Sequence, residues 1–132
     1  GYELDPEDTG LIRRIAQERG GEFVHIINDP DEAVVGADVV YVKSWGSLRH
    51  FGQTEAEAAF RSGLRDWRLT AARLRSTREG KGLVMHCLPV RRNVEIDDAV
   101  LDGPSSVVVD EAENRLHVQR ALLLELLGRG SA

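Results

Sequence analysis

Four short runs of apolar residues, each preceded by a glycine or another turn residue, divide the chain and predict β-strands. They span 23–28, 39–42, 83–87 and 107–109. Unbroken apolar runs of this length are typical of strands that are buried on both faces, as in a parallel sheet. In the first run the side chains alternate between two faces, and we interpret His25 as an edge or partly buried strand residue.

Segments with helical periodicity lie between these runs and after the last one. One helix is predicted to start near Pro6 and to stop at Gly20. Shorter helical segments span 30–35, 54–63, 66–78 and 94–101. The last and longest helix has Asn114 as its N-cap and Arg115 as its first residue. Strand and helix therefore alternate, which favours right-handed parallel crossovers. We predict an α/β fold: a Rossmann-like, three-layer parallel sheet with helices on both faces, incomplete at about four strands.

Composition narrows the classes of protein to which the chain can belong. Its 132 residues suffice for one hydrophobic core but not for two. The net charge of -5 argues against a nucleic-acid-binding protein, which would show a basic face. No apolar stretch is long enough to cross a bilayer and no secretory signal is present, so we expect no membrane partner. The single cysteine fits a reducing compartment, and we expect a soluble, cytoplasmic protein.

Two groups of residues follow buried strands at the edge where open α/β sheets bind ligands. Pro89 ends the third strand because it cannot donate to a sheet, which leaves the carbonyls of Cys87 and Leu88 without ladder partners. Both carbonyls can accept hydrogen bonds from an amide-like ligand. Arg115 follows the fourth strand at the start of a helix, where its side chain can polarise a carbonyl oxygen.

Other roles compete with this interpretation. As a nucleophile Cys87 needs a base, but the adjacent His86 points to the opposite face of the strand. As a metal ligand Cys87 has no partner at a known spacing, so we predict no metal site. A buried structural cysteine stays open as an alternative, and Arg115 can instead form a salt bridge with Glu111 or Glu113.

A second loop at the same edge follows the strand at 39–42 and carries Lys43, Ser44 and Trp45. A lysine directly after a buried strand is poorly placed for core packing, and loops at this edge are often functional. We interpret the three residues as part of a functional loop, with a solvated loop and a packing tryptophan as the alternative. Glu95 loads the first turn of a predicted helix with acid, which the helix dipole explains without any function.

The segment 86–89, His-Cys-Leu-Pro, is followed one strand later by Asp-Glu-Ala-Glu-Asn-Arg-Leu-His-Val-Gln at 110–119. In this order and spacing the two motifs resemble the transcarbamylase family, the aspartate and ornithine carbamoyltransferases, which move a carbamoyl group from carbamoyl phosphate to an amine. Within that family the chain is most similar to the branch that acts on N-acetylornithine. The resemblance implies carbamoyl phosphate and N-acetylornithine, or a related amine, as ligands. It also implies no cofactor, a place in arginine biosynthesis and a trimeric complete protein.

The resemblance also assigns roles to residues. The carbonyls of Cys87 and Leu88, before a cis bond to Pro89, hold the carbamoyl NH₂, and Arg115 binds the carbamoyl oxygen. Cys87 and Arg115 are thus the expected catalytic residues. The expected substrate-binding residues are Lys43, Ser44, Trp45, Cys87, Leu88, Pro89 and Arg115. Ornithine carbamoyltransferases carry an aspartate and a Ser-Met-Gly motif in the region of Lys43. A cation there suits the carboxylate of an amino acid whose α-nitrogen is acylated.

Two departures limit what the resemblance implies. Ser76-Thr77-Arg78 looks like the phosphate clamp of the family, but it lies at the C-terminal end of a predicted basic helix, so we interpret it as a solvated face. No counterpart of the N-terminal, carbamoyl-phosphate-binding domain is present. We interpret 1–132 as a partial C-terminal, ornithine-binding-type domain, inactive alone, whose open sheet edge repacks or is filled by another chain. An ornithine or succinylornithine transcarbamylase and a non-catalytic Rossmann-like ligand-binding module are the alternatives.

Overall fold

The computed structural model describes residues 3–20 and 25–128, and these divide into two compact units. The first unit draws on the described residues up to Ala33 and on Trp45–Leu64. The second draws on Val34–Ser44 and on the described residues from Arg65 onward. The second unit contains the sheet and most of the predicted site.

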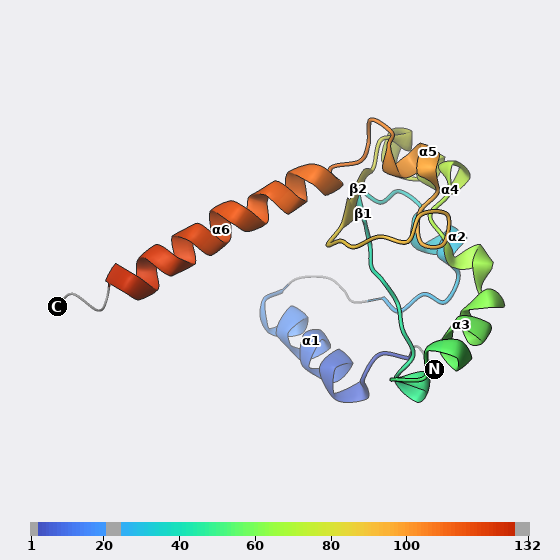
Figure 1. Cartoon of the computed structure of the whole chain (residues 1–132), viewed down its shortest axis with the longest axis horizontal. Coiled ribbons are helices and arrows are strands. Elements are labelled where there is room, and N and C mark those ends of the chain that lie inside the picture. The colour runs from blue at the N-terminus through green and yellow to red at the C-terminus, as the bar shows by residue number, and fades with distance from the viewer. Residues whose placement is uncertain (1–2, 21–24, 129–132) are drawn as a thin grey trace. The chain divides into compact units, whose positions relative to one another are not determined.

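Two parallel strands form the sheet of the second unit. β1 (Val39–Val42) pairs in parallel with β2 (Leu83–His86) so that Val42 lies opposite His86. The two strands are labelled next to each other in Figure 1. Ser106 adds a single parallel bridge to Val84 on the other side of β2. The predicted α/β fold with a parallel sheet is therefore confirmed, although only two of the four predicted strands form in the described chain.

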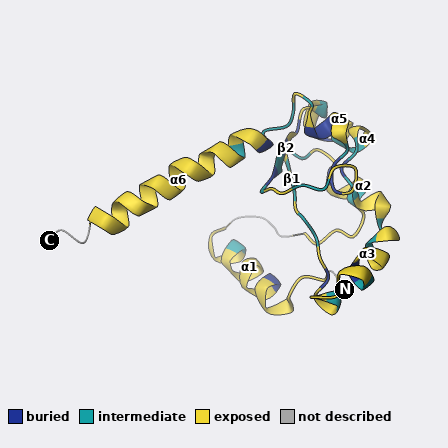
Figure 2. Cartoon of the chain, in the orientation of Figure 1, coloured by how far each residue is buried: buried dark blue, intermediate teal, exposed yellow. Residues whose placement is uncertain are grey.

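The core of the second unit lies against one face of this small sheet. Its buried apolar residues are Val34, Leu69, Val84, Ile96, Val100, Leu101 and Val108. Along β1 burial alternates (Figure 2). Val39 and Tyr41 are 46% and 50% exposed. The prediction that this strand is buried on both sides is therefore wrong. The unbroken apolar run of β1 is typical of a strand buried on both faces. Within the described residues, however, the core covers only one of its faces.

The C-terminal helix begins earlier than the sequence suggested. α6 spans Val108–Gly128, and its first turn closes with the Glu111 N–H donating to the Val107 carbonyl at 2.9 Å. The predicted strand at 107–109 and the predicted start at Arg115 are both wrong. Three consecutive valines favour a strand, but only the backbone up to Val107 reaches β2, so tertiary context overrides the local preference. No helix within residues 3–20 or 25–128 is both long and apolar enough to cross a membrane.

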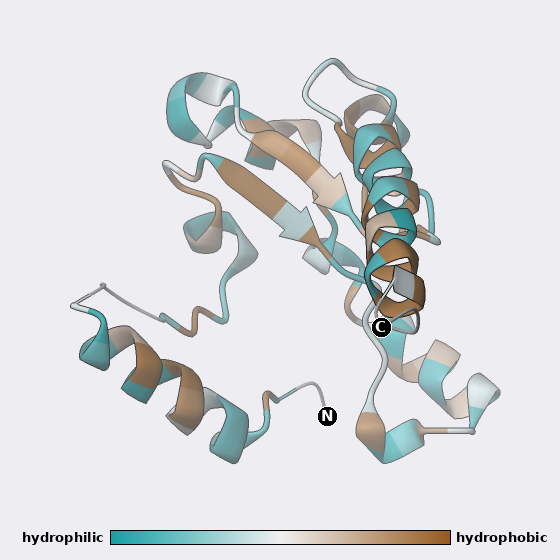
Figure 3. Ribbon diagram, turned by 90° about the vertical axis from the view of Figure 1, so that its left-hand side faces the viewer, coloured by the Kyte–Doolittle hydropathy of each residue, from teal (hydrophilic) through white to brown (hydrophobic). Residues whose placement is uncertain are grey.

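Other helices of the second unit are shorter than predicted. The segment 66–78 forms a 3₁₀ turn (Arg65–Trp67), α4 (Ala71–Arg75) and a second 3₁₀ turn (Arg78–Gly80). Within 94–101 only α5 (Asp98–Leu101) is helical. Figure 3 shows the two apolar strands beside these short helical pieces.

The segment Ser76-Thr77-Arg78 is a structural turn. Thr77 is buried, where its hydroxyl donates to the Leu74 carbonyl at 2.6 Å and accepts the Gly82 N–H at 2.9 Å. A Cβ at position 82 would lie 2.7 Å from the Thr77 Cβ, so only glycine allows the chain to enter β2 this closely. The interpretation of this segment as a solvated face is therefore wrong at Thr77. The segment follows the C-terminal end of α4, and this place in the chain was the reason for not interpreting it as a phosphate clamp.

The first unit is helical. α1 (Pro6–Glu18) begins after Asp5, whose carboxylate accepts the Glu7 N–H at 2.8 Å. α2 (Pro30–Ala33), a 3₁₀ turn (Leu48–His50) and α3 (Thr54–Ser62) complete the unit. The predicted helices near Pro6 and at 30–35 and 54–63 are confirmed. Of the predicted strand at 23–28, residues 23–24 lie outside the described residues, and 25–28, including His25, do not form a strand.

Candidate functional site

The two loops that follow β1 and β2 meet at the carboxyl edge of the sheet. Lys43 and Ser44 follow β1, and Cys87 follows β2. The Ser44 hydroxyl lies 3.1 Å from the Pro89 carbonyl oxygen and 3.2 Å from the Glu95 Oε2, and it shares its single proton between these two acceptors. The first loop is thereby linked to the end of the second. The structure thus brings Lys43-Ser44 next to the Cys87–Pro89 loop, as expected for strands that run in parallel. Trp45 is half-buried and belongs to the first unit.

The loop after β2 has an unusual backbone. The Leu88–Pro89 bond is cis, as the resemblance implied, and Leu88 has a φ of 51°. A leucine in the left-handed region is uncommon and points to a constrained, functional backbone. The Leu88 N–H donates to the His86 Nδ1 at 2.9 Å. Within the described chain no hydrogen bond to the carbonyl of Cys87 or Leu88 is formed, so both oxygens are able to accept one from a ligand.

Beneath this loop, the carboxylate of Glu95 is completely buried and is held by three residues. Its Oε2 accepts the Arg91 N–H at 2.9 Å and lies 3.2 Å from both the Ser44 Oγ and the His86 Nε2. Its Oε1 accepts from the Arg91 Nε at 2.5 Å. One carboxylate therefore ties together the loop after β1, the end of β2 and the chain that follows Pro89.

The contacts of His86 determine its tautomer. Because the Nδ1 accepts the Leu88 N–H, the ring proton lies on the Nε2 and is donated to Glu95. Both ring nitrogens are thus engaged, and neither can act as a base for Cys87. This agrees with the prediction that the two neighbours do not form a catalytic dyad.

The ionisation of Glu95 follows from its partners. Burial by itself raises the pKa of this carboxyl, but the N–H and the guanidinium of Arg91 and the hydroxyl of Ser44 outweigh burial and lower the pKa below its ordinary value. The carboxylate is thus the stable form. The helix-dipole interpretation of Glu95 is wrong, because the residue precedes α5 and lies in the core. In the sequence, the only nearby indication that Glu95 forms an ion pair was Arg91, four residues earlier.

The first turns of α6 are fixed to both strands by Glu111. Its Oε1 accepts the Tyr41 hydroxyl at 2.6 Å and its Oε2 accepts the His86 N–H at 3.0 Å. The hydrogen bond to Glu111, then burial, the Glu111 charge and the nearby Cys87 raise the pKa of Tyr41 to about 12. The tyrosine therefore remains a donor at neutral pH.

Arg115 lies one helical turn beyond Glu111 and is exposed. Among the described residues it forms no ion pair. Glu111 is engaged with the strands, and the Glu113 Oε1 lies 3.8 Å from the His117 Nε2. The alternative in which Arg115 is held by a salt bridge is therefore not realised. Because α6 starts at Val108, Arg115 does not stand at the helix N-terminus, and the predicted placement of Arg115 at the start of the helix is wrong.

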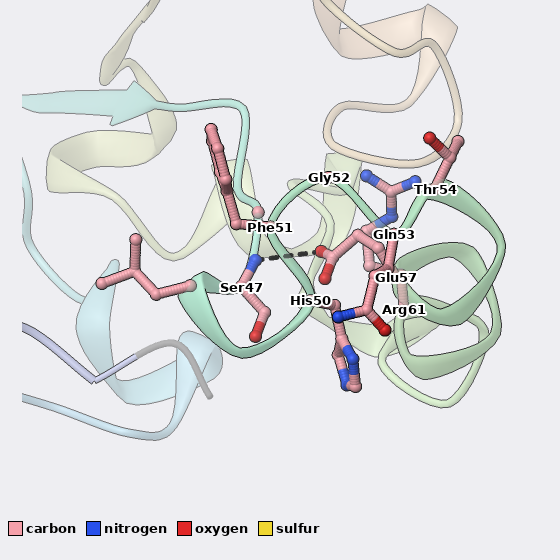
Figure 4. Close-up of a pocket in the computed structure, with 10 residues that line it drawn as sticks. Ser47, His50, Phe51, Gly52, Gln53, Thr54, Glu57 and Arg61 are labelled. Carbon is pink, nitrogen blue, oxygen red and sulfur yellow. Dashed lines mark hydrogen bonds between the residues drawn. The ribbon is translucent and has the colours of Figure 1, made fainter.

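The first unit has a pocket of its own, formed by the loop before α3 and by α3 itself (Figure 4). At its base the buried Glu57 Oε1 accepts the Ser47 N–H at 3.0 Å. The Ser47 Oγ in turn accepts the Arg49 N–H at 3.0 Å. Leu48 and Phe51 are 85% and 86% exposed on the same loop. The beginning of the loop is thus tied to α3 while its apolar side chains face solvent.

We expect a Glu57→Ala variant to release this loop from α3. The Ser47 N–H then loses its carboxylate acceptor, and an amide opened to solvent exchanges its hydrogen faster. A net hydrogen bond to a charged group contributes about 1.5–3 kcal/mol, so exchange at Ser47 should accelerate about 10–100-fold. Glu55→Ala, a change of the same type at an exposed position of α3, is the matched control. Unchanged exchange in the Glu57 variant would show that the contact does not hold the loop.

Comparison with known proteins supplies the wider context. Residues 1–126 match the family model described as aspartate/ornithine carbamoyltransferase, Asp/Orn binding domain. The chain is 41% identical over 128 residues to an N-acetylornithine carbamoyltransferase of Xanthomonas campestris, covering 97% of this chain and 37% of that protein. It is 46% identical over 123 residues to an ornithine carbamoyltransferase of Syntrophus aciditrophicus, covering 93% and 38%.

A solved structure of acetylornithine transcarbamylase complexed with acetylcitrulline superposes with a TM-score of 0.81 at 42% identity, covering 95% of this chain and 36% of that one. A variant of N-acetyl-L-ornithine transcarbamylase complexed with carbamyl phosphate and N-succinyl-L-norvaline gives the same TM-score of 0.81. The chain spans little more than a third of the length of the relatives it matches, 37% and 38% of two of them.

Proposed function

Because the chain belongs to the aspartate/ornithine carbamoyltransferase family and spans its Asp/Orn binding domain, we propose a specific role for it. It forms the amino-acid-binding part of an enzyme that transfers the carbamoyl group of carbamoyl phosphate to the side-chain amine of N-acetylornithine. The observation that carries the proposal is the junction at the carboxyl edge of the sheet. There, two acceptor carbonyls, Lys43 and the start of the helix that bears Arg115 come from three separate segments.

In the proposed reaction the carbonyls of Cys87 and Leu88 accept hydrogen bonds from the carbamoyl NH₂. Arg115 donates to the carbamoyl oxygen. The neutral amine attacks the carbamoyl carbon, the C=O electron pair moves onto oxygen, and Arg115 stabilises the resulting oxyanion. The oxyanion electron pair then re-forms the C=O bond, the bond from carbon to the phosphate oxygen breaks, and the leaving phosphate takes up the proton that the nitrogen loses. Catalysis rests on position and charge, without a covalent enzyme intermediate.

Lys43 is the proposed determinant of the amine. An acylated α-nitrogen is neutral and needs no carboxylate partner, whereas the α-carboxylate that remains pairs with a cation. Lys43 is exposed beside Ser44, and among the described residues it forms no ion pair. Ser44 is fixed by Glu95 and the Pro89 carbonyl, so Lys43 is presented next to the carbonyls that hold the carbamoyl group. We include Trp45 in the proposed binding loop because it follows directly.

The relatives support both proposed ligands. They include an N-acetylornithine carbamoyltransferase, and the solved structures contain carbamyl phosphate with N-succinyl-L-norvaline in one case and acetylcitrulline in another. The relative from Syntrophus aciditrophicus favours ornithine as the second candidate amine. The family resemblance also leads us to propose a trimeric complete protein, located in the cytoplasm and acting in arginine biosynthesis.

The proposed function is tested by assaying the full-length protein that carries this chain against ornithine, N-acetylornithine and N-succinylornithine. We expect N-acetylornithine to be carbamoylated with the highest kcat/KM. In a Lys43→Ala variant the KM for this substrate should rise about 10–100-fold, the value of one charge-assisted contact. Lys81→Ala, which alters an exposed lysine at the amino end of β2, is the control. A clear preference for ornithine, or an unchanged KM in the Lys43 variant, would contradict the proposed substrate.

A further inference from the structure

Glu111 joins α6 to β1 and β2, the three elements that carry or adjoin the residues of the proposed reaction. We infer that Glu111 is a positioning residue: it holds the first turns of α6 against the carboxyl ends of β1 and β2, and so presents Arg115 to the carbonyls of Cys87 and Leu88. This inference rests on the proposed function and deepens it, because it explains how an exposed arginine reaches a fixed place in the site.

The two carboxylate oxygens of Glu111 contact different strands. Oε1 accepts the hydroxyl of Tyr41 from β1 at 2.6 Å, and Oε2 accepts the N–H of His86 from β2 at 3.0 Å. Charge-assisted hydrogen bonds of this kind are short and strongly directional. A single carboxylate with both oxygens engaged fixes its own orientation as well as its position, so the backbone of α6 at this turn is held to both strand ends.

A second anchor lies one turn earlier. The Val107 N–H donates to the Val84 carbonyl at 2.9 Å, and the Val84 N–H donates to the Ser105 carbonyl at 2.8 Å. The start of α6 is thereby attached to the middle of β2, and Glu111 attaches the next turn to its end. Two anchors four residues apart define the direction of the helix axis as well as its starting point.

The anchored turn at Glu111 directly precedes the turn of α6 that carries Arg115. Val107, Glu111 and Arg115 are each four residues apart, and four helical residues advance about 6 Å and return to nearly the same face. Arg115 thus lies one turn beyond Glu111 on nearly the same side of α6, and Glu111 binds the backbone of His86, the residue directly before Cys87 and Leu88.

The inference is tested with a double-mutant cycle in the full-length protein, using Glu111→Ala, Arg115→Ala and the combination. We expect Glu111→Ala to lower kcat about 10–100-fold while the KM for the amine changes little. In the Arg115→Ala background the same change should cost less than about 2-fold, because there is no guanidinium left to position. Glu113→Ala, an exposed residue of the same helix, should keep full activity.

A rescue variant separates geometry from charge. In Glu111→Gln the side-chain carbonyl can accept from the His86 N–H and the amide can donate to the Tyr41 oxygen, so kcat should remain within about 3-fold of the unsubstituted protein. If Glu111→Ala does not fold, Tyr41→Phe removes one of the two contacts and enters the same cycle with Arg115→Ala.

Two results would overturn the inference: an equal loss of kcat from Glu111→Ala with and without Arg115, or full activity in Glu111→Ala. If instead the proposed function itself is wrong, the Arg115→Ala variant alone leaves kcat unchanged, and this result is distinct from the two results above.

Discussion

An Arg115→Ala variant of the full-length protein should lose about 10²–10³-fold in kcat, equivalent to about 2.7–4 kcal/mol of transition-state stabilisation. The guanidinium is the only proposed donor from this chain to the oxygen on which negative charge develops. Its interaction strengthens as the carbonyl becomes tetrahedral, so the loss falls on kcat more than on the KM for the amine.

Steady-state kinetics with carbamoyl phosphate and N-acetylornithine provide the measurement. Arg120→Ala is the matched control, since Arg120 is also exposed on α6 but lies more than one turn beyond Arg115. It removes the same positive charge from the helix, and we expect it to change kcat less than about 2-fold, as for a surface charge distant from the reacting atoms. Equal losses in the two variants would indicate a general electrostatic effect and would contradict the assignment of Arg115.

A Glu95→Ala variant should lose about 3 kcal/mol of free energy of unfolding. Removing one member of a buried ion pair costs about 3–5 kcal/mol because the other groups stay behind without partners. The Arg91 side chain keeps 34% exposure and can turn toward water, which places the loss at the lower end of that range. His86 is fully buried and cannot do so, and its Nε2–H is left without an acceptor.

Glu95→Gln should not restore this stability. The Arg91 N–H, the Ser44 hydroxyl and the His86 Nε2–H all converge on Oε2, and Arg91 Nε donates to Oε1. A glutamine replaces one of these oxygens with an NH₂ group, which sets donor against donor whichever way the amide is turned. Urea denaturation of both variants, with Glu113→Ala as the exposed control, tests this. Stability equal to the unsubstituted protein in Glu95→Gln would show that the network is not a set of donors around a carboxylate.

The same carboxylate makes stability depend on pH. The pKa of Glu95 in the folded protein is lower than the ordinary value of a glutamate carboxyl. Its contribution is therefore fully present above about pH 4.5 and is lost as the pH falls through the lowered folded pKa. In Glu95→Gln this part of the acid sensitivity should disappear, although carboxylates elsewhere keep theirs.

The sequence was sufficient to predict the strands and loops that carry the site. The apolar strand before Pro89 and the apolar strand before Lys43 both have local signals, namely an apolar run and, in the first case, a residue that cannot continue a ladder. Parallel strands bring their carboxyl ends together, so the contact of Ser44 with the loop after β2 follows from topology alone. The same reasoning predicted helices near Pro6 and at 54–63, where caps and periodicity are local.

The parts that were missed depend on contacts between residues far apart in the sequence. Glu95 precedes a short helix, and its acidic neighbours resemble an ordinary first turn. Only the fold places Ser44 and His86 around it. Glu111 lies four residues before Arg115, which suggested a salt bridge within one helix, but Tyr41 lies 70 residues away and accounts for its Oε1. Local spacing cannot rank a nearby partner against a distant one.

The start of α6 shows the same limit for secondary structure. The valines at 107–109 have strand propensity, yet only one bridge to β2 forms, at Ser106. A strand gains stability by pairing with its neighbours. Here the pairing stops after one residue. The backbone groups that follow form helical hydrogen bonds instead, beginning with the Glu111 N–H, which donates to the Val107 carbonyl. The position of Arg115 within the helix, rather than at its first residue, follows from this difference.

The central claim is that the carbonyls of Cys87 and Leu88 and the guanidinium of Arg115 bind one carbamoyl group. A crystal structure of the full-length protein with carbamoyl phosphate and an unreactive analogue of N-acetylornithine tests this most directly. We predict that both carbonyl oxygens lie about 2.7–3.1 Å from the carbamoyl nitrogen and that Arg115 lies equally close to the carbamoyl oxygen. A carbamoyl group bound by other residues, with Arg115 directed into solvent, would contradict the account.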